Sequence, residues 1–269
     1  MIVRPPAVAG RFYPADPAAL TNLIGGFIDR EVERNPAIGV VVPHAGYIYS
    51  GHVAGALYSR LKLPARVIIL CPNHTGMGAA LSIMESGSWK TPLGELQIDR
   101  ELCDALIHAD PQLEDDTLAH RMEHAIEVQL PFLQFLQHQE TRFVPITVGV
   151  SLWKSLEILG NAIGNTIAMF DRSILIMASS DMNHYESDAI TRVKDAMAID
   201  PLLRLDAKAL HDTVRRERIS MCGAGPATVM LIAARMLGAT RAELVKYATS
   251  AEVSGDYDRV VGYAGVLVA

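Results

Sequence analysis

Cysteine is scarce in this sequence, and long apolar segments are missing. The 269 residues include three cysteines, Cys71, Cys103 and Cys222, which are too few and too scattered for a disulfide framework or a Cys-x-x-Cys zinc motif. No apolar run approaches the roughly 20 residues of a membrane span, and the first residues lack the apolar core of a secretory signal. We therefore expect a cytoplasmic protein with reduced thiols and no membrane association.

Basic residues form no cluster along the chain, and the formal net charge is −6. This balance argues against nucleic-acid binding as the main task. Internal repeats and low-complexity segments are also missing. Half of the residues are hydrophobic, which is enough for a sizeable core. These features indicate a soluble globular protein that acts on a small or polar substrate.

Short apolar runs alternate with helical patterns along the whole chain. The runs predict buried strands at residues 38–43, 66–72, 143–148, 173–178, 242–248 and 260–268. Helical patterns include one from Asp16 to about Glu33, with Pro17 in its first turn, and one that contains residues 124–130. The sequence therefore predicts one α/β domain over residues 1–269, with helices packed on a mixed central sheet.

Residues that bind metals or move protons follow three of these strands. His44 follows the first strand, His74 follows the second, and Asp181 and His184 follow the strand at residues 173–178. Open α/β sheets bind their ligands beyond the carboxyl ends of the strands, where loops bring distant residues together. The three strand ends therefore predict one shared site.

Cys222 is a further candidate for this site. It lies three to four residues ahead of a predicted helix that includes residues 227–237. Backbone amides and the positive end of the helix dipole favour a thiolate at such a position. Imidazole, carboxylate and thiolate groups are the usual protein ligands of transition metals. Cys222 is thus either a ligand or one more buried small residue, and we interpret Cys71 and Cys103 as structural.

Two other patterns allow hydrolytic chemistry. The segment from His120 to His124 fits H-x-x-E-H, in which two histidines on one helical face hold zinc and Glu123 acts as base. Ser179, close to Asp181, could instead belong to a hydrolase triad, although the pattern G-x-S-x-G is missing. Zinc-dependent hydrolysis, by the first pattern or by the strand-end site, therefore stays an alternative.

Six sequence blocks resemble those of one known family. They are residues 6–14 (Pro-Ala-Val-Ala-Gly-Arg-Phe-Tyr-Pro), 43–51 (Pro-His-Ala-Gly-Tyr-Ile-Tyr-Ser-Gly), 72–76 (Pro-Asn-His-Thr-Gly), 123–131 (Glu-His-Ala-Ile-Glu-Val-Gln-Leu-Pro), 179–185 (Ser-Ser-Asp-Met-Asn-His-Tyr) and Cys222-Gly223. In this order they are similar to the blocks of the Memo family, which is called AmmeMemoRadiSam system protein B in prokaryotes. The resemblance implies a fold like that of the LigB-type class III extradiol dioxygenases, which are non-haem Fe(II) enzymes.

The matching blocks also imply roles for individual residues. His44 and His74 would be paired imidazole ligands of a metal, and Cys222 would be the third ligand. His184 would act as acid or base in the pocket, and Asp181 would orient it or join the coordination shell. Further positions implied in the pocket or behind the ligands are Tyr47, His124 and Glu127.

One difference from the dioxygenases affects the expected chemistry. Those enzymes use two histidines and a carboxylate, whereas the third position here is the thiol of Cys222. A thiolate is a softer ligand that suits copper, zinc or iron and can itself be oxidised. The resemblance therefore implies a metal cofactor, iron or copper ahead of zinc, but not ring-cleaving activity.

The family resemblance implies metal-dependent redox or oxygen chemistry on an unknown small substrate. The same pocket could instead bind a peptide, a partner protein or a metal without turnover. Prokaryotic members are associated with radical-SAM and AMMECR-type proteins, which are therefore the expected partners.

Overall fold

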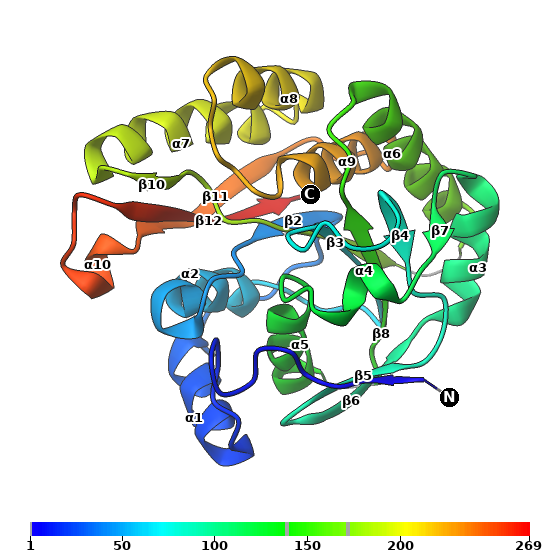
Figure 1. Cartoon of the computed structure of the whole chain (residues 1–269), viewed down its shortest axis with the longest axis horizontal. Helices are drawn as coiled ribbons and strands as arrows, with labels where there is room; N and C mark the ends of the chain where they lie inside the picture. Colours follow the sequence, from blue (N-terminus) through cyan, green and yellow to red (C-terminus); the bar gives the residue numbers. More distant parts are fainter. Residues whose placement is uncertain (1, 138–139, 171–172) are drawn as a thin grey trace.

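Four parallel strands with buried side chains form the centre of the fold (Figure 1). In the computed structural model, which describes residues 2–137, 140–170 and 173–269, their order is β8, β3, β9, β2. They are β2 (Gly39–Val42), β3 (Arg66–Pro72), β8 (Arg142–Val148) and β9 (Ile174–Ser179). These strands are rich in valine, isoleucine and leucine, which is typical of strands covered on both faces.

Shorter and antiparallel strands extend this centre on both sides. Next to β2 lie β12 (Val260–Val268) and its two partners, β11 (Ala242–Thr249) and β10 (His184–Glu186), all antiparallel. Next to β8 lie β6 (Gly94–Ile98), β5 (Ser88–Thr91) and β1 (Val3–Arg4) in that order, with β4 (Leu81–Ile83) and β7 (Glu114–Asp115) beside them. Within the described residues the sheet is mixed, as predicted.

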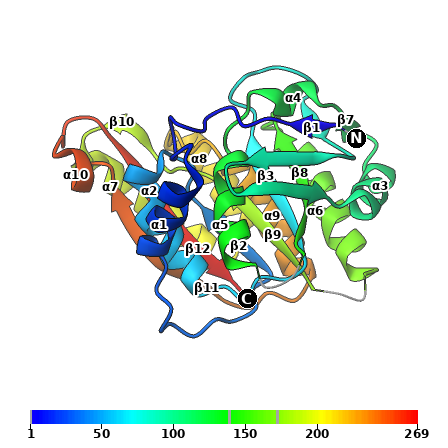
Figure 2. The same cartoon turned by 90° about the horizontal axis from the view of Figure 1, so that it is seen from below.

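Helices cover both faces of the sheet (Figures 1 and 2). One face carries α6 (Trp153–Ala168), α7 (Asp188–Leu203), α8 (Ala207–Arg216) and α9 (Ala224–Met236), with α9 packed directly on β2, β3 and β9. The other face carries α1 (Pro17–Phe27), α2 (Tyr47–Ser59) and α5 (Leu130–Leu136). The remaining short elements are α3 (Arg100–Ala109), α4 (Leu118–Arg121), η1 (Glu127–Gln129) and α10 (Ala251–Ser254). The predicted single α/β domain with flanking helices is confirmed.

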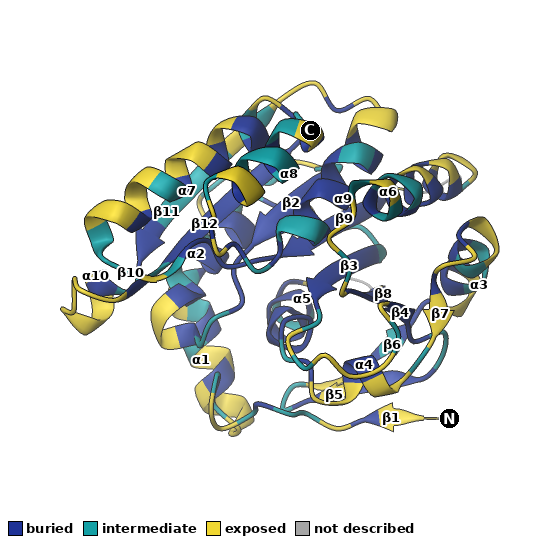
Figure 3. Cartoon of the chain, turned by 45° about the horizontal axis from the view of Figure 1, so that its top comes forward, coloured by how far each residue is buried: buried dark blue, intermediate teal, exposed yellow. Residues whose placement is uncertain are grey.

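The burial of side chains follows this layered arrangement. Figure 3 shows buried strands beneath helices whose outer faces are exposed. Among the described residues, none of the helices combines the length and the apolar character that a membrane crossing requires.

Two predicted helices differ from those observed. The helix predicted to reach Glu33 ends at Phe27. The backbone N–H of Asp29 donates to Ser59 Oγ, and the Asp29 carboxylate accepts the backbone N–H of Glu31, so these N–H groups do not continue the helix. Residues 124–130 form no continuous helix, since η1 starts only at residue 127 and α5 at residue 130. In this second region the Glu123 carboxylate accepts the backbone N–H of Ala125, so in both cases side chains compete for backbone hydrogen bonds.

Candidate metal centre

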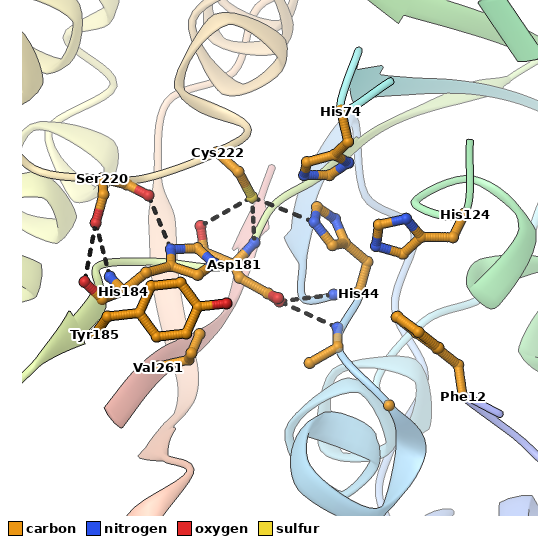
Figure 4. Close-up of a pocket in the computed structure, with 12 residues that line it drawn as sticks. Phe12, His44, His74, His124, Asp181, His184, Tyr185, Ser220, Cys222 and Val261 are labelled. Carbon is orange, nitrogen blue, oxygen red and sulfur yellow. Dashed lines mark hydrogen bonds between the residues drawn. The ribbon is translucent and has the colours of Figure 1, made fainter. Parts of the chain in front are cut away.

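The carboxyl ends of the parallel strands form one side of a pocket of about 590 Å³ (Figure 4). It is lined by six of the residues that the sequence analysis selected: His44, His74, His124, Asp181, His184 and Cys222. Since β2, β3 and β9 run parallel, the residues that follow them reach the same edge of the sheet. The strand-end argument therefore leads to one pocket.

Among the described residues two groups of side chains could hold a metal ion, and one of them is His74, Glu123 and His124. The other is the predicted set of His44, His74 and Cys222. One ligand atom of each lies within 4.8 Å of those of the other two, and Cys222 Sγ is 3.2 Å from His44 Nε2. Metal–nitrogen and metal–sulfur bonds of about 2.0–2.3 Å place ligand atoms about 3.3–3.7 Å apart in a tetrahedral site. The three side chains therefore fit a single ion after small shifts, and the donor set of two imidazoles and one thiol suits a transition metal.

The hydrogen bonds of Ser179 determine which nitrogen of His44 carries the proton. Ser179 Oγ donates its one proton to the carbonyl of Ala125 at 2.6 Å and accepts from Gln129 Nε2 at 2.9 Å. His44 Nδ1, at 3.0 Å from the same oxygen, must therefore be the donor. The neutral ring then presents an unprotonated Nε2 toward Cys222.

Glu123 gives His74 the same tautomer. The Glu123 carboxylate accepts hydrogen bonds from the backbone N–H of His74 at 2.7 Å and from the ring Nδ1–H of His74 at 2.9 Å. It also accepts a hydrogen bond from the backbone N–H of Ala125. A carboxylate at one ring nitrogen leaves the other free to bind a metal and increases its basicity. Glu123 therefore orients a candidate ligand, which differs from the role of base in the hydrolase alternative.

The pKa values agree with these hydrogen bonds. Burial lowers the pKa of His44 to about 3, so its ring stays neutral. Burial is the largest single effect on Glu123 and would raise its pKa, but the hydrogen bond and charge of His74, the N–H of Ala125 and the charge of His124 together lower it to about 2. Burial is likewise the largest effect on His74 and would lower its pKa, but the hydrogen bond and charge of Glu123 and the charge of Asp181 together raise it above the ordinary value. The pair thus consists of a carboxylate and an imidazole with basic character.

The thiol of Cys222 differs from the sequence-based expectation. Helix α9 begins at Ala224, two residues later, and yet burial, with a further contribution from Asp181, raises the pKa of Cys222 well above its ordinary range. Desolvation of the thiolate outweighs the favourable helix end, so the metal-free protein holds a protonated thiol. A bound metal ion would replace this proton.

A close backbone approach holds Cys222 in place. The N–H of Gly223 donates to Ser180 Oγ at 3.0 Å, and a Cβ at this glycine would lie 2.5 Å from the carbonyl of Ser179. The thiol also accepts the N–H of Asp181 at 3.3 Å. Glycine at position 223 therefore allows the thiol to reach the strand end at β9.

Asp181 and His184 take different partners within the pocket (Figure 4). The Asp181 carboxylate accepts the backbone N–H groups of His44 and Ala45, and burial raises its pKa. His184 Nδ1 lies 2.9 Å from the carbonyl of Ser220, which can only accept, so this nitrogen carries the proton. The His184 ring is therefore oriented by Ser220 rather than by Asp181, and in its neutral form Nε2 is the nitrogen without a proton.

Three other residues from the sequence analysis have distinct positions. His124 lines the pocket with its ring stacked on His74, 4.8 Å between centroids. Tyr47 and Glu127 are buried behind the pocket: Tyr47 donates to the carbonyl of Val128, and Glu127 contacts the N-terminal segment.

The interpretation of residues 120–124 as a zinc-protease motif is wrong. Helix α4 ends at Arg121, so His120 and His124 do not share a helical face. His120 is fully buried outside the pocket, with Nδ1 3.1 Å from Thr147 Oγ1. The Ser179 hydroxyl donates to the Ala125 carbonyl, which also removes the basis for a serine triad.

Sequence reasoning missed several residues of the pocket wall, among them Phe12, Tyr185, Ser220 and Val261. Phe12 packs against His124 with 4.8 Å between ring centroids. Tyr185 has a left-handed backbone, φ 63°, which is rare for a bulky residue and often marks a functional site. Neither feature has a local sequence pattern, although both residues belong to blocks shared with the family.

The fold and the pocket together define an α/β protein with a pocket that brings two histidines and one cysteine together. The comparisons with known proteins identify its family: the family model described as Memo-like protein matches residues 4–267. A MEMO1 family protein of Methanopyrus kandleri is 42% identical over 98% of both chains. One of Ignicoccus hospitalis is 42% identical over 99% of this chain and 98% of its own, and one of Methanosarcina barkeri is 41% identical over 99% and 100%. The chain belongs to the Memo family.

Proposed function

We propose that this protein binds one metal ion through His44, His74 and Cys222 and uses it for redox or oxygen-dependent chemistry on a small substrate. The observation that carries the proposal is the convergence of three ligand atoms within 4.8 Å of one another. Both imidazoles already hold their protons on Nδ1, through Ser179 and Glu123, so their Nε2 atoms need no rearrangement.

The donor set supports iron or copper ahead of zinc. Two imidazoles and a soft thiolate stabilise metals that change oxidation state, and a bound ion of this kind would supply electron transfer or activation of oxygen. A relation to the LigB-type dioxygenases in fold is part of this proposal.

The surrounding residues would bind the substrate and move protons. His184 Nε2 is positioned as a base, because its Nδ1–H is held by the Ser220 carbonyl. Asp181 holds the backbone at His44 and so keeps the ligand in place. The rings of Phe12 and Tyr185 line the pocket and would exclude water from a small substrate.

Metal content tests the proposal directly. Protein purified without oxygen should contain close to one iron or copper ion, and His44→Ala, His74→Ala and Cys222→Ser should each lose it. His108→Ala is the matched control, because His108 is exposed on α3 and bonds only to its own helix. The metal should be measured by inductively coupled plasma mass spectrometry.

Other outcomes have defined meanings. Zinc as the only metal would favour hydrolysis at the same site. A wild type that takes up no metal after reconstitution would refute the proposal, and a pocket that binds a peptide or partner would then be the better explanation.

A further inference from the structure

Arg4 is a buried arginine at the start of the chain, and its contacts lead to the metal centre. It ends β1, is 4% exposed, and its guanidinium lies 4.0 Å above the ring of Trp89. Its nitrogens donate to three acceptors on one loop and on the short helices that flank it: Nε to the carbonyl of His120 at 2.7 Å, Nη2 to the carbonyl of Glu123 at 2.6 Å, and Nη1 to Glu127 Oε2 at 2.7 Å.

This loop has little regular structure of its own. Residues 122–126 lie between the end of α4 and the start of η1, and yet Glu123, Ala125 and Ile126 are fully buried. Carbonyls at the end of a helix lack intrahelical donors, and buried carbonyls need partners. The planar fork of Arg4 supplies donors to two of them at once, which the single ammonium of a lysine cannot do with the same geometry.

The same loop orients the ligand His74. The Glu123 carboxylate accepts the backbone N–H and Nδ1–H of His74, while Arg4 holds the carbonyl of Glu123 from the other side. We infer that Arg4 is a positioning residue for the metal centre: it fixes residues 120–127 so that Glu123 holds the His74 ring with Nε2 facing the pocket. The part of this inference that concerns metal affinity rests on the proposed function.

The test compares Arg4→Lys with Tyr13→Phe. Tyr13 donates to Glu127 Oε1 at 2.6 Å, so its replacement disturbs the same buried carboxylate without affecting the carbonyls of His120 and Glu123. In metal-free protein at mildly alkaline pH, NMR of the histidine ring nitrogens reports the tautomer of His74. Wild type and Tyr13→Phe should hold the proton on Nδ1, and Arg4→Lys should show a mixture of both tautomers.

Titration with cobalt(II) provides the second readout. Loss of groups behind metal ligands typically weakens affinity about 10–100-fold. The affinity of Arg4→Lys for cobalt(II) should therefore be lower than that of wild type by a factor of about ten or more. The affinity of Tyr13→Phe should lie within about twofold of wild type. If Arg4→Lys does not fold, the double variant Arg4→Met with Glu127→Gln removes both charges together and should show the same tautomer mixture, whereas Glu127→Gln alone should not.

The two readouts separate this inference from the proposed function. A single Nδ1–H tautomer of His74 in the variants that lack Arg4 would overturn the inference, whatever the metal affinity. A wild type that binds no cobalt(II) would count against the proposed metal site, and the tautomer measurement would still decide the role of Arg4.

Discussion

The hydroxyl of Ser179 should control the orientation of the candidate ligand His44, and Ser179→Ala tests this without changing any residue of the pocket wall. The substitution removes one oxygen that accepts from His44 Nδ1 and Gln129 Nε2 and donates to the carbonyl of Ala125. Gln129 keeps its second bond, to the carbonyl of Pro43. Two buried groups, the His44 Nδ1–H and the Ala125 carbonyl, therefore lose this partner.

The size of the effect follows from these two groups. A buried polar group left without a partner costs about 1–3 kcal/mol, so the metal-free variant should be about 2–6 kcal/mol less stable. The His44 ring would also no longer be held with its proton on Nδ1. Metal affinity should then fall about 10–100-fold, as is typical when the group behind a ligand is lost.

Urea unfolding of the metal-free protein and chelator competition would measure the two effects separately. Ser59→Ala is the matched control: Ser59 is also buried, donates to the carbonyl of Gly55 and accepts the N–H of Asp29, but it lies on α2 outside the pocket. It should lose stability and keep its metal affinity. Unchanged metal affinity in Ser179→Ala, within about twofold of wild type, would refute the assignment of the His44 tautomer.

Two further predictions concern pH and backbone packing. Burial lowers the pKa of His120 from 6.5 to about 4. The histidine therefore binds a proton more readily in the unfolded chain than in the folded protein. The stability that the neutral ring contributes is present above pH 6.5 and is lost as the pH falls toward 4. Urea unfolding at several pH values measures this loss of stability, which should be about 3 kcal/mol smaller in His120→Gln than in wild type. An unchanged pH dependence of stability in this variant would contradict the lowered pKa of His120. Gly223→Ala should lower the free energy of unfolding by about 1–3 kcal/mol and weaken metal binding, because the new Cβ would collide with Ser180. Gly26→Ala on α1 is the control, because a Cβ at Gly26 meets open space and should not destabilise the protein. A Gly223→Ala protein with wild-type metal affinity would show that Cys222 is not held through this contact.

The strands were the most predictable part of the fold. Strand β3 has the predicted bounds, and β2, β8 and β9 differ from prediction by one or two residues at their ends. Strands buried on both faces consist of continuous apolar runs, and a run that ends at proline or a polar residue marks its own limits.

Helix ends and tautomers depend on contacts that no local pattern contains. Asp29 ends α1 partly through Ser59, which lies 30 positions away, and Glu123 meets His74 from 49 positions away. The burial that raises the pKa of Cys222 likewise exists only in the folded chain. The sequence therefore located six residues of the pocket, while the rest of its wall and the hydrogen-bonding partners required the structure. The roles of these residues as metal ligands stay predictions.

The distance along the chain between the candidate ligands has a consequence for biosynthesis. His44 and Cys222 are 178 positions apart, although their side chains touch. At about 5–20 residues per second, a ribosome needs roughly 9–36 seconds to synthesise that interval. During this time the nascent chain offers both histidines but not the thiol of Cys222, and the turn at residue 222 cannot dock on β9. The candidate three-ligand site is therefore completed late in folding, and an ion that requires all three residues could be loaded only after the last of them has left the ribosome.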